Sequence, residues 1–251
     1  WRQMFLGLAA TSVVVWLALF AWMPETIDVV RRDGQRQAPA AFSLRQIGLG
    51  YLALLRNRRF IGASLTLGLM SLPLIAWIGL APVLLMQRLE LSALEYGLWQ
   101  IPVFAAVILG NLLLDRLLVR HTLAQVIGLA LWPFCLGLLG LIAAALSSAA
   151  LPLAVCALAV YALGLGMSNA ALYRLALFSS DAGKGLVSAM IGMLSIAVMG
   201  SGGSLIAIIG GGSNLQSFSL LAGLGGLLCL PLLYRLLRHP PRPPHINKDI
   251  R

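Results

Sequence analysis

Two long stretches without any charged residue constrain the fold of this chain most. Thr122–Tyr173 and Gly185–Tyr234 contain no Asp, Glu, Lys or Arg over 52 and 50 residues. A helix crosses the hydrocarbon of a bilayer with about 20 apolar residues, so each stretch must cross twice. Three shorter charge-free stretches fit one crossing each. We therefore predict seven transmembrane helices, at residues 3–23, 60–86, 96–115, 122–146, 151–177, 185–209 and 215–236.

The composition leads to the same fold class. Of the 251 residues, 60% are hydrophobic and only 10% are charged, whereas about 25% of the residues of a soluble domain are charged. A water-soluble fold of this size has too much surface to hide so many apolar side chains. The strands of a membrane barrel alternate polar and apolar residues, which these stretches do not. We therefore expect an all-α integral membrane protein, because helices satisfy their backbone hydrogen bonds internally.

The positive charges fall on one side of the predicted membrane. The net charge is +10, and sixteen of the eighteen Lys and Arg residues lie in connections that share a side with the loop 24–59 and with the C-terminus. Cytoplasmic loops carry such an excess of Lys and Arg. The charge pattern therefore predicts a cytoplasmic C-terminus and an N-terminus on the outer side. The basic excess is a signal of topology, and we expect no binding of nucleic acid.

The order of the predicted helices indicates a part of a larger transporter. The chain begins with Trp1, and the first helix follows at once on the outer side, without a signal peptide. We expect earlier helices upstream, in a missing N-terminal half. The segments are then the last helix of that half (1–23), a central cytoplasmic loop with an amphipathic helix (24–59), a six-helix half (60–238) and a disordered cytoplasmic tail (239–251). This order is typical of the second part of a six-plus-six transporter.

Ionisable residues within the predicted helices are scarce. No Asp or Glu lies in the body of a predicted span, and the three histidines lie in loops or in the tail. The three cysteines are scattered, and the two lysines lie outside the spans. The sequence therefore predicts neither an enzyme nor a site for a metal or cofactor. Any proton coupling would have to use residues outside this chain.

Two patterns have both a functional and an ordinary explanation. The segments Ser71–Ile78 and Gln100–Phe104, and the spacing of Met190, Met193 and Met199, suit an apolar pocket of aromatic and flexible side chains. Plain helix packing explains the same residues. Arg174, at the cytoplasmic end of the predicted fifth helix, can reach the headgroups. It can also pair with Asp181 or contribute to a cytoplasmic gate.

Several segments carry a family resemblance that covers almost the whole chain. They are Met23-Pro-Glu-Thr26, Ser71–Trp77, Glu95-Tyr-Gly-Leu98 with Pro102 and Phe104, Gly110–Leu114, and Ser180–Gly185. With these segments the chain resembles the second half of drug/proton antiporters of the major facilitator superfamily. The resemblance implies that the seven helices are the sixth to twelfth of twelve. It also implies export of lipophilic, often cationic drugs, with the proton as the coupling ion, across the bacterial inner membrane.

The resemblance also suggests individual site residues. The positions that match the drug cavity of the family are Leu74, Ile75, Ile78 and Phe104, and further candidates are Asn111, Met193, Ile196 and Ala197. The cytoplasmic loop motif of the superfamily has a degenerate copy here, in which Gly110 stands five residues before Asp115 rather than four. The candidates for a gate are Asp115, Arg116, Arg174 and Asp181. For Asp115 and Arg116, solvation of a helix end is the alternative.

Two other functions remain open from the residues alone. A sugar or metabolite porter of the same superfamily would have the same fold. The predicted helices, however, hold few of the hydrogen-bonding side chains that a sugar site would favour. A seven-helix receptor would share the orientation, although a first residue within a membrane segment and the lack of extracellular cysteines disfavour it. An upstream reading frame with about five more spans would separate a transporter from a receptor.

Overall fold

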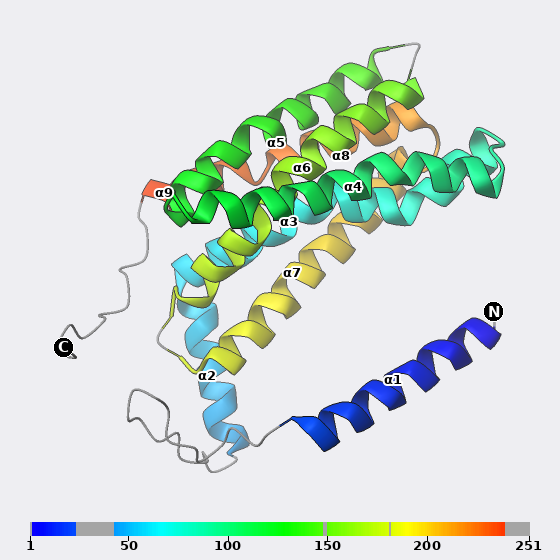
Figure 1. Cartoon of the computed structure of the whole chain (residues 1–251). Coiled ribbons are helices and arrows are strands. Elements are labelled where there is room, and N and C mark those ends of the chain that lie inside the picture. Colours follow the sequence, from blue (N-terminus) through cyan, green and yellow to red (C-terminus); the bar gives the residue numbers. More distant parts are fainter. Residues whose placement is uncertain (1, 24–42, 148–149, 181, 239–251) are drawn as a thin grey trace. The chain divides into compact units, whose positions relative to one another are not determined.

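The computed structural model describes residues 2–23, 43–147, 150–180 and 182–238, and every regular element within these ranges is helical (Figure 1). Seven of the helical segments are long and apolar enough to cross a membrane. The predicted all-α membrane fold is therefore confirmed. Most of the predicted loop, the whole predicted tail and Asp181 lie outside the described residues.

The chain forms two compact units, residues 1–45 and 46–251. The first contains α1 (Arg2–Trp22). The hydroxyl groups of Thr11 and Ser12 donate hydrogen bonds to the carbonyl oxygens of Gly7 and Leu8, one turn earlier in the same helix. Because these hydroxyls are satisfied within the helix, they do not prevent α1 from crossing an apolar layer.

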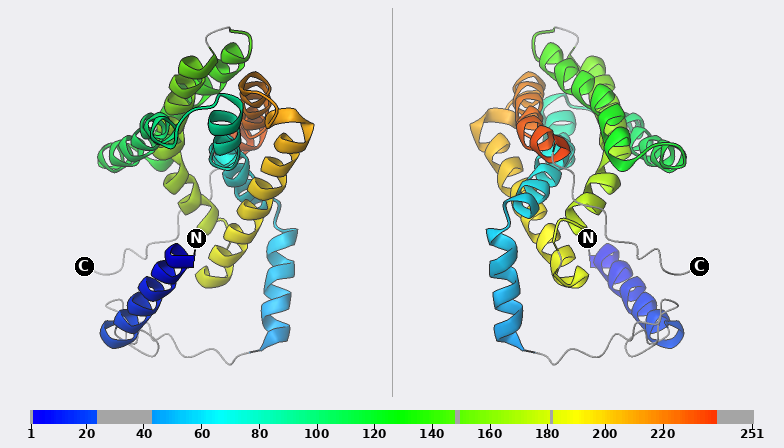
Figure 2. Two further views of the ribbon diagram at one scale, coloured as in Figure 1. Left: turned by 90° about the vertical axis from the view of Figure 1, so that its right-hand side faces the viewer. Right: turned by 90° about the vertical axis from the view of Figure 1, so that its left-hand side faces the viewer.

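The second unit is arranged around the two helices α3 and α6. Helix α3 packs against α7, α6 packs against both α4 and α5, and α5 also packs against α8 (Figures 1 and 2). In the described residues, α4 and α7 pack against α6 and α3 rather than against each other. The bounds are α2 (Leu44–Arg56), α3 (Arg58–Ala81), α4 (Ala93–Leu118), α5 (Leu123–Ala145), α6 (Ala150–Leu177), α7 (Lys184–Ile206), α8 (Leu215–Leu227) and α9 (Leu230–Arg238).

Glycines allow the helices around α6 to approach closely. A Cβ atom at Gly164 would lie 2.5 Å from the backbone nitrogen of Phe134, and one at Gly166 would lie 2.5 Å from the carbonyl oxygen of Val107. A Cβ atom at Gly137 of α5 would lie closer still to the backbone nitrogen of Tyr161. Small residues are the usual means by which membrane helices pack without a hydrophobic driving force. Glycines therefore make the close approach possible on both sides of α6, toward α5 and toward α4.

Prolines change two of the predicted helices. At Pro82 the helix α3 continues as a wide π-helical turn, η1 (Pro82–Arg88), because proline cannot donate the usual backbone hydrogen bond. The last predicted helix is interrupted between α8 and α9, just before Pro231 in the first turn of α9. After α7, in a second π-helical turn, η2 (Ala207–Gly211), Gly210 has a φ of 118°, which suits glycine. The chain then turns into Asn214, whose side chain caps α8.

The predicted amphipathic helix is present as α2. Its Leu54 is buried, and a Cβ atom at Gly50 would lie 2.6 Å from a methyl group of Leu186 in α7. Asn57, which follows α2, caps α3 and donates a side-chain hydrogen bond of 3.3 Å to the carbonyl oxygen of Ser179. The neighbouring Leu55 is exposed. Helix α2 is therefore attached to the second unit through one face.

Candidate substrate-binding face

The candidate residues of α3 lie on the side of that helix between its contacts with α7 and α4. Helix α3 meets α7 at Gly68, where a Cβ atom would lie 2.7 Å from Val198, and meets α4 through Trp77. Between these contacts Ile75 and Ile78 are exposed, and Leu74 is half-buried. The exposed apolar side chains are available to a ligand or to another part of a larger protein.

The candidate residues of α4 form one stripe. Phe104 stands four residues after Gln100, and Asn111 stands seven after Phe104, so the three share a helix face. Phe104 is 42% exposed. The side-chain amide of exposed Asn111 donates a hydrogen bond of 3.0 Å to the carbonyl oxygen of Val107. Because the carbonyl oxygen of this amide has no partner among the described residues, it is free to accept a hydrogen bond from a ligand.

Trp77 and Gln100 join the α3 and α4 parts of this face. The indole nitrogen of fully buried Trp77 donates a hydrogen bond of 2.8 Å to the side-chain oxygen of Gln100. The Trp77 ring also packs against Phe218 of α8, with the ring centroids 5.5 Å apart. This bond could not be predicted from the sequence, because nothing in the spacing of Trp77 and Gln100 relates the two residues.

Trp77→Phe should destabilise the protein, whereas Trp132→Phe should not. The first change removes the indole donor, leaves the Gln100 oxygen unpaired and opens a void in the core, at a cost of about 1–3 kcal/mol. Trp132 of α5 is 79% exposed and serves as a matched control. The measurement is the apparent melting temperature of the purified protein in detergent. Equal shifts for the two variants would contradict the structural role of Trp77.

The candidate residues of α7 lie on the side of that helix that points away from α3. Ser195 faces α3 and donates a hydrogen bond of 3.3 Å to the carbonyl oxygen of Ser64. Met193, Ile196 and Ala197 are exposed. No hollow described in this chain is lined by any of the eight substrate-binding candidates. The Trp77–Gln100 hydrogen bond therefore links the helices that carry the α3 and α4 candidates, whereas the α7 candidates lie on a separate exposed surface.

The gate candidates are only partly described. Asp115 and Arg116 are exposed near the end of α4, and Arg174 is exposed near the end of α6. The structure shows no ion pair of Arg174 within the described ranges, and Asp181 lies outside them. Near Arg174, the hydroxyl groups of Tyr173 in α6 and Ser188 in α7 form a hydrogen bond. This hydrogen bond between the two helices could not be predicted from the sequence, since neither residue belongs to a recognised motif.

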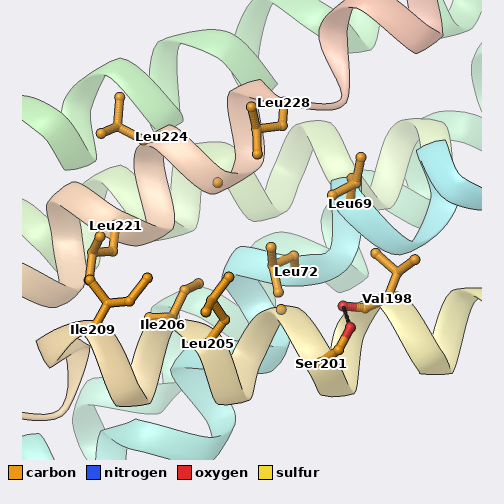
Figure 3. A pocket seen from close by; sticks show the side chains of 12 residues that line it. Leu69, Leu72, Val198, Ser201, Leu205, Ile206, Ile209, Leu221, Leu224 and Leu228 are labelled. Atoms are coloured by element: carbon orange, nitrogen blue, oxygen red, sulfur yellow. Dashed lines mark hydrogen bonds between the residues drawn. The ribbon is translucent and has the colours of Figure 1, made fainter.

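A separate apolar hollow lies between α3, α7 and α8. Its volume is about 600 Å³, and leucine, isoleucine and valine side chains line most of it (Figure 3). The hydroxyl of Ser201, a polar group in this lining, donates to the carbonyl oxygens of Ala197 and Val198 in its own helix. Leu69 faces the hollow, whereas Ile78 stands nine residues later, on the opposite side of α3. The hollow is thus distinct from the candidate face.

Comparison with known proteins supports the resemblance found in the sequence. No family model matches the chain. The chain is 41% identical over 242 residues to the multidrug transporter MdfA of Edwardsiella ictaluri (strain 93-146), and 40% identical over 241 residues to that of Escherichia coli O157:H7. It is 37% identical over 242 residues to MdfA of Yersinia pestis (strain D106004). These alignments cover 95% to 96% of this chain.

The chain covers a smaller share of each relative than the alignments cover of the chain itself. The chain spans 56% of the length of the Edwardsiella and Escherichia proteins and 57% of the Yersinia protein. One long helix in a separate unit and six further membrane helices are consistent with the C-terminal half of such a transporter. The resemblance is thereby confirmed, and the chain is similar to these multidrug transporters over little more than half of their length.

Proposed function

We propose that this chain is the C-terminal part of a proton-coupled multidrug exporter of the bacterial inner membrane. The observation that supports this most is the identity of about 40% to MdfA proteins over almost the whole chain. The helices α3 and α4 then supply one apolar wall of a drug cavity, and the missing N-terminal half supplies the other. A wall that exposes Ile75, Ile78 and Phe104 suits lipophilic substrates. The C-terminus is cytoplasmic in this proposal.

The proposal places proton coupling outside this chain. Glu90, Glu95 and Asp115 are the carboxylates among the described residues, and all three stand at or beyond helix ends. A proton-driven exporter needs a titratable group that both sides of the membrane can reach. The seven helices expose no such carboxylate at mid-membrane in their described parts. The two halves would then rock against one another around the cavity, with this half as the apolar partner.

The experiment is drug accumulation in cells that carry the full-length gene. We expect lower accumulation of a lipophilic cationic dye in these cells than in cells with an empty vector, and we expect a protonophore to abolish the difference. A gene that leaves accumulation unchanged would refute drug export. Export that continues in the presence of the protonophore would refute proton coupling but not drug export.

Phe104→Ala in the full-length protein should change the pattern of drug resistance without lowering the amount of protein. The side chain is 42% exposed on the candidate face, so its loss removes contact area from bulky substrates more than it disturbs the core. We expect a rise of about tenfold in sensitivity to the largest aromatic drugs, if a buried contact worth about 1.4 kcal/mol is lost. Resistance profiles and immunoblots of the membrane fraction measure both quantities. Leu109→Ala, on another side of α4 and 55% exposed, is the control.

A further inference from the structure

Three arginines surround a hollow where α9 packs against the first turns of α3. The hollow has a volume of about 220 Å³ and is lined by Arg58, Arg59 and Gly62 of α3 and by Leu232, Arg235 and Leu236 of α9. The helices α3 and α9 pack against each other, and Phe60 of α3 and Leu233 of α9 are almost completely buried. The hollow is therefore part of the packed structure, although its arginines are exposed.

These three positive charges have no counter-charge in the described part of the chain. Glu90 and Glu95 follow the opposite end of α3, and Asp115 belongs to α4, which packs against α6. No ion pair joins any of these carboxylates to the three arginines. Arg58 and Arg59 also occupy the first turn of α3, where the helix dipole disfavours a cation. An anion within the hollow would relieve both the mutual repulsion and the effect of the dipole.

The rest of the lining suits an anion that carries an apolar chain. Leu232 and Leu236 form an apolar wall beside the charges, and the glycine leaves the space between the helices open. The hollow lies where one membrane-crossing segment begins and the last one ends, which is where a bilayer would place the lipid headgroups. We propose that it binds the phosphate group of an anionic phospholipid, with the three guanidinium groups around the phosphate and the two leucines against the first part of the acyl chains.

Gly62 offers a test of the shape of this site that leaves its charge intact. A Cβ atom at Gly62 would meet no other atom within 4 Å, so a larger side chain can enter the hollow without displacing its neighbours. Gly62→Leu should therefore fill the space meant for the headgroup while α3 and α9 stay packed. A merely electrostatic attraction of lipids to a basic surface would not respond to this change.

The experiment measures phosphatidylglycerol retained by the full-length protein in neutral detergent, by native mass spectrometry over a titration of the lipid. We expect each removed guanidinium to lower the apparent affinity about fivefold. The triple variant Arg58→Gln, Arg59→Gln, Arg235→Gln should therefore lose most binding, and Gly62→Leu should lose a comparable part. The control triple variant replaces three exposed arginines that do not line the hollow, namely Arg45, Arg56 and Arg120, and should bind as the unchanged protein does.

Three results would overturn the proposal. The first is an equal loss in the two triple variants, which would indicate only a general effect of charge. The second is unchanged binding in Gly62→Leu, which would show that the hollow is not the site. The third is displacement of phosphatidylglycerol by millimolar inorganic phosphate, which would identify a soluble anion as the ligand. If the first triple variant does not fold, Gly62→Leu decides the question, because it keeps all three charges.

Discussion

Replacing Gly166 by valine should prevent the second unit from folding. A Cβ atom at this position would lie 2.5 Å from the carbonyl oxygen of Val107 and 3.1 Å from the Cα atom of Gly110. The contact is reciprocal, since a Cβ atom at Gly110 would lie 2.4 Å from the carbonyl oxygen of Leu163. All of these atoms are backbone, so no side-chain rotation can relieve the clash. Only a separation of α4 from α6 can relieve the clash.

The expected cost exceeds that of an ordinary overpacked core. Extra methylene groups in a packed core cost about 1–3 kcal/mol when side chains and backbone can shift. Here the shift would also break the packing of a central helix against its neighbour, in a protein whose total stability is only about 5–15 kcal/mol. We therefore expect little or no folded Gly166→Val protein. Fluorescence-detected gel filtration of the full-length protein, fused to a fluorescent protein, measures the folded fraction as the monodisperse peak.

Gly128→Val is the matched control for this prediction. Gly128 also lies within a membrane helix, α5, but a Cβ atom there would meet nothing within 4 Å. Both variants replace a helical glycine by valine, so they share the same change of intrinsic helix propensity and differ in what the new side chain meets. A normal peak for Gly166→Val, or an equal loss for Gly128→Val, would show that the close contact of α4 and α6 is not what the fold depends on.

The number and position of the membrane helices could be predicted from the charge-free runs and the turns within them. A charge that is not paired or solvated is costly within the bilayer, so charge-free runs mark the spans and glycine-rich or polar turns divide the two longest runs. The prolines were harder to interpret. Pro73, Pro102 and Pro133 lie within continuous helices, whereas Pro82 begins a π-helical turn and Pro231 follows a break. The outcome depends on which neighbours satisfy the freed carbonyl groups, and a single sequence does not contain this information.

The candidate face could be predicted only residue by residue. The resemblance suggested Ile75, Ile78 and Phe104, and the structure shows that these side chains are exposed. The resemblance could not show that Trp77 and Gln100 connect α3 and α4, because that contact depends on how the two helices lie in the folded protein. Membrane helices are apolar on every side, so their hydrophobic pattern does not reveal which face meets protein and which meets lipid. Whether the eight residues bind substrate stays a prediction.

An aspartate introduced at two equally exposed positions should distinguish a lipid-facing surface from the exposed surface of the α7 candidates. Leu136 of α5 is 65% exposed and Ile196 of α7 is 66% exposed. Each lies near the middle of its helix. Leu136 belongs to a stripe with Leu129, Trp132 and Leu139, all exposed on α5, whose other sides pack against α6 and α8. If this stripe faces the hydrocarbon, Leu136→Asp exchanges a favourable residue for one that costs about 3 kcal/mol at the centre of a bilayer.

Ile196→Asp should be tolerated, because the proposed transporter places this face of α7 toward a water-filled cavity or the other half of the protein. A carboxylate there keeps its water or finds a polar partner, and the penalty of the bilayer does not apply. We expect the membrane fraction to hold near-normal amounts of folded Ile196→Asp protein and at least tenfold less of Leu136→Asp, measured by the same gel filtration. Drug export by Ile196→Asp can still change, since the charge enters the α7 part of the proposed binding site. Equal loss of the two variants would show that Ile196 also faces lipid and would remove the α7 residues from the proposed site.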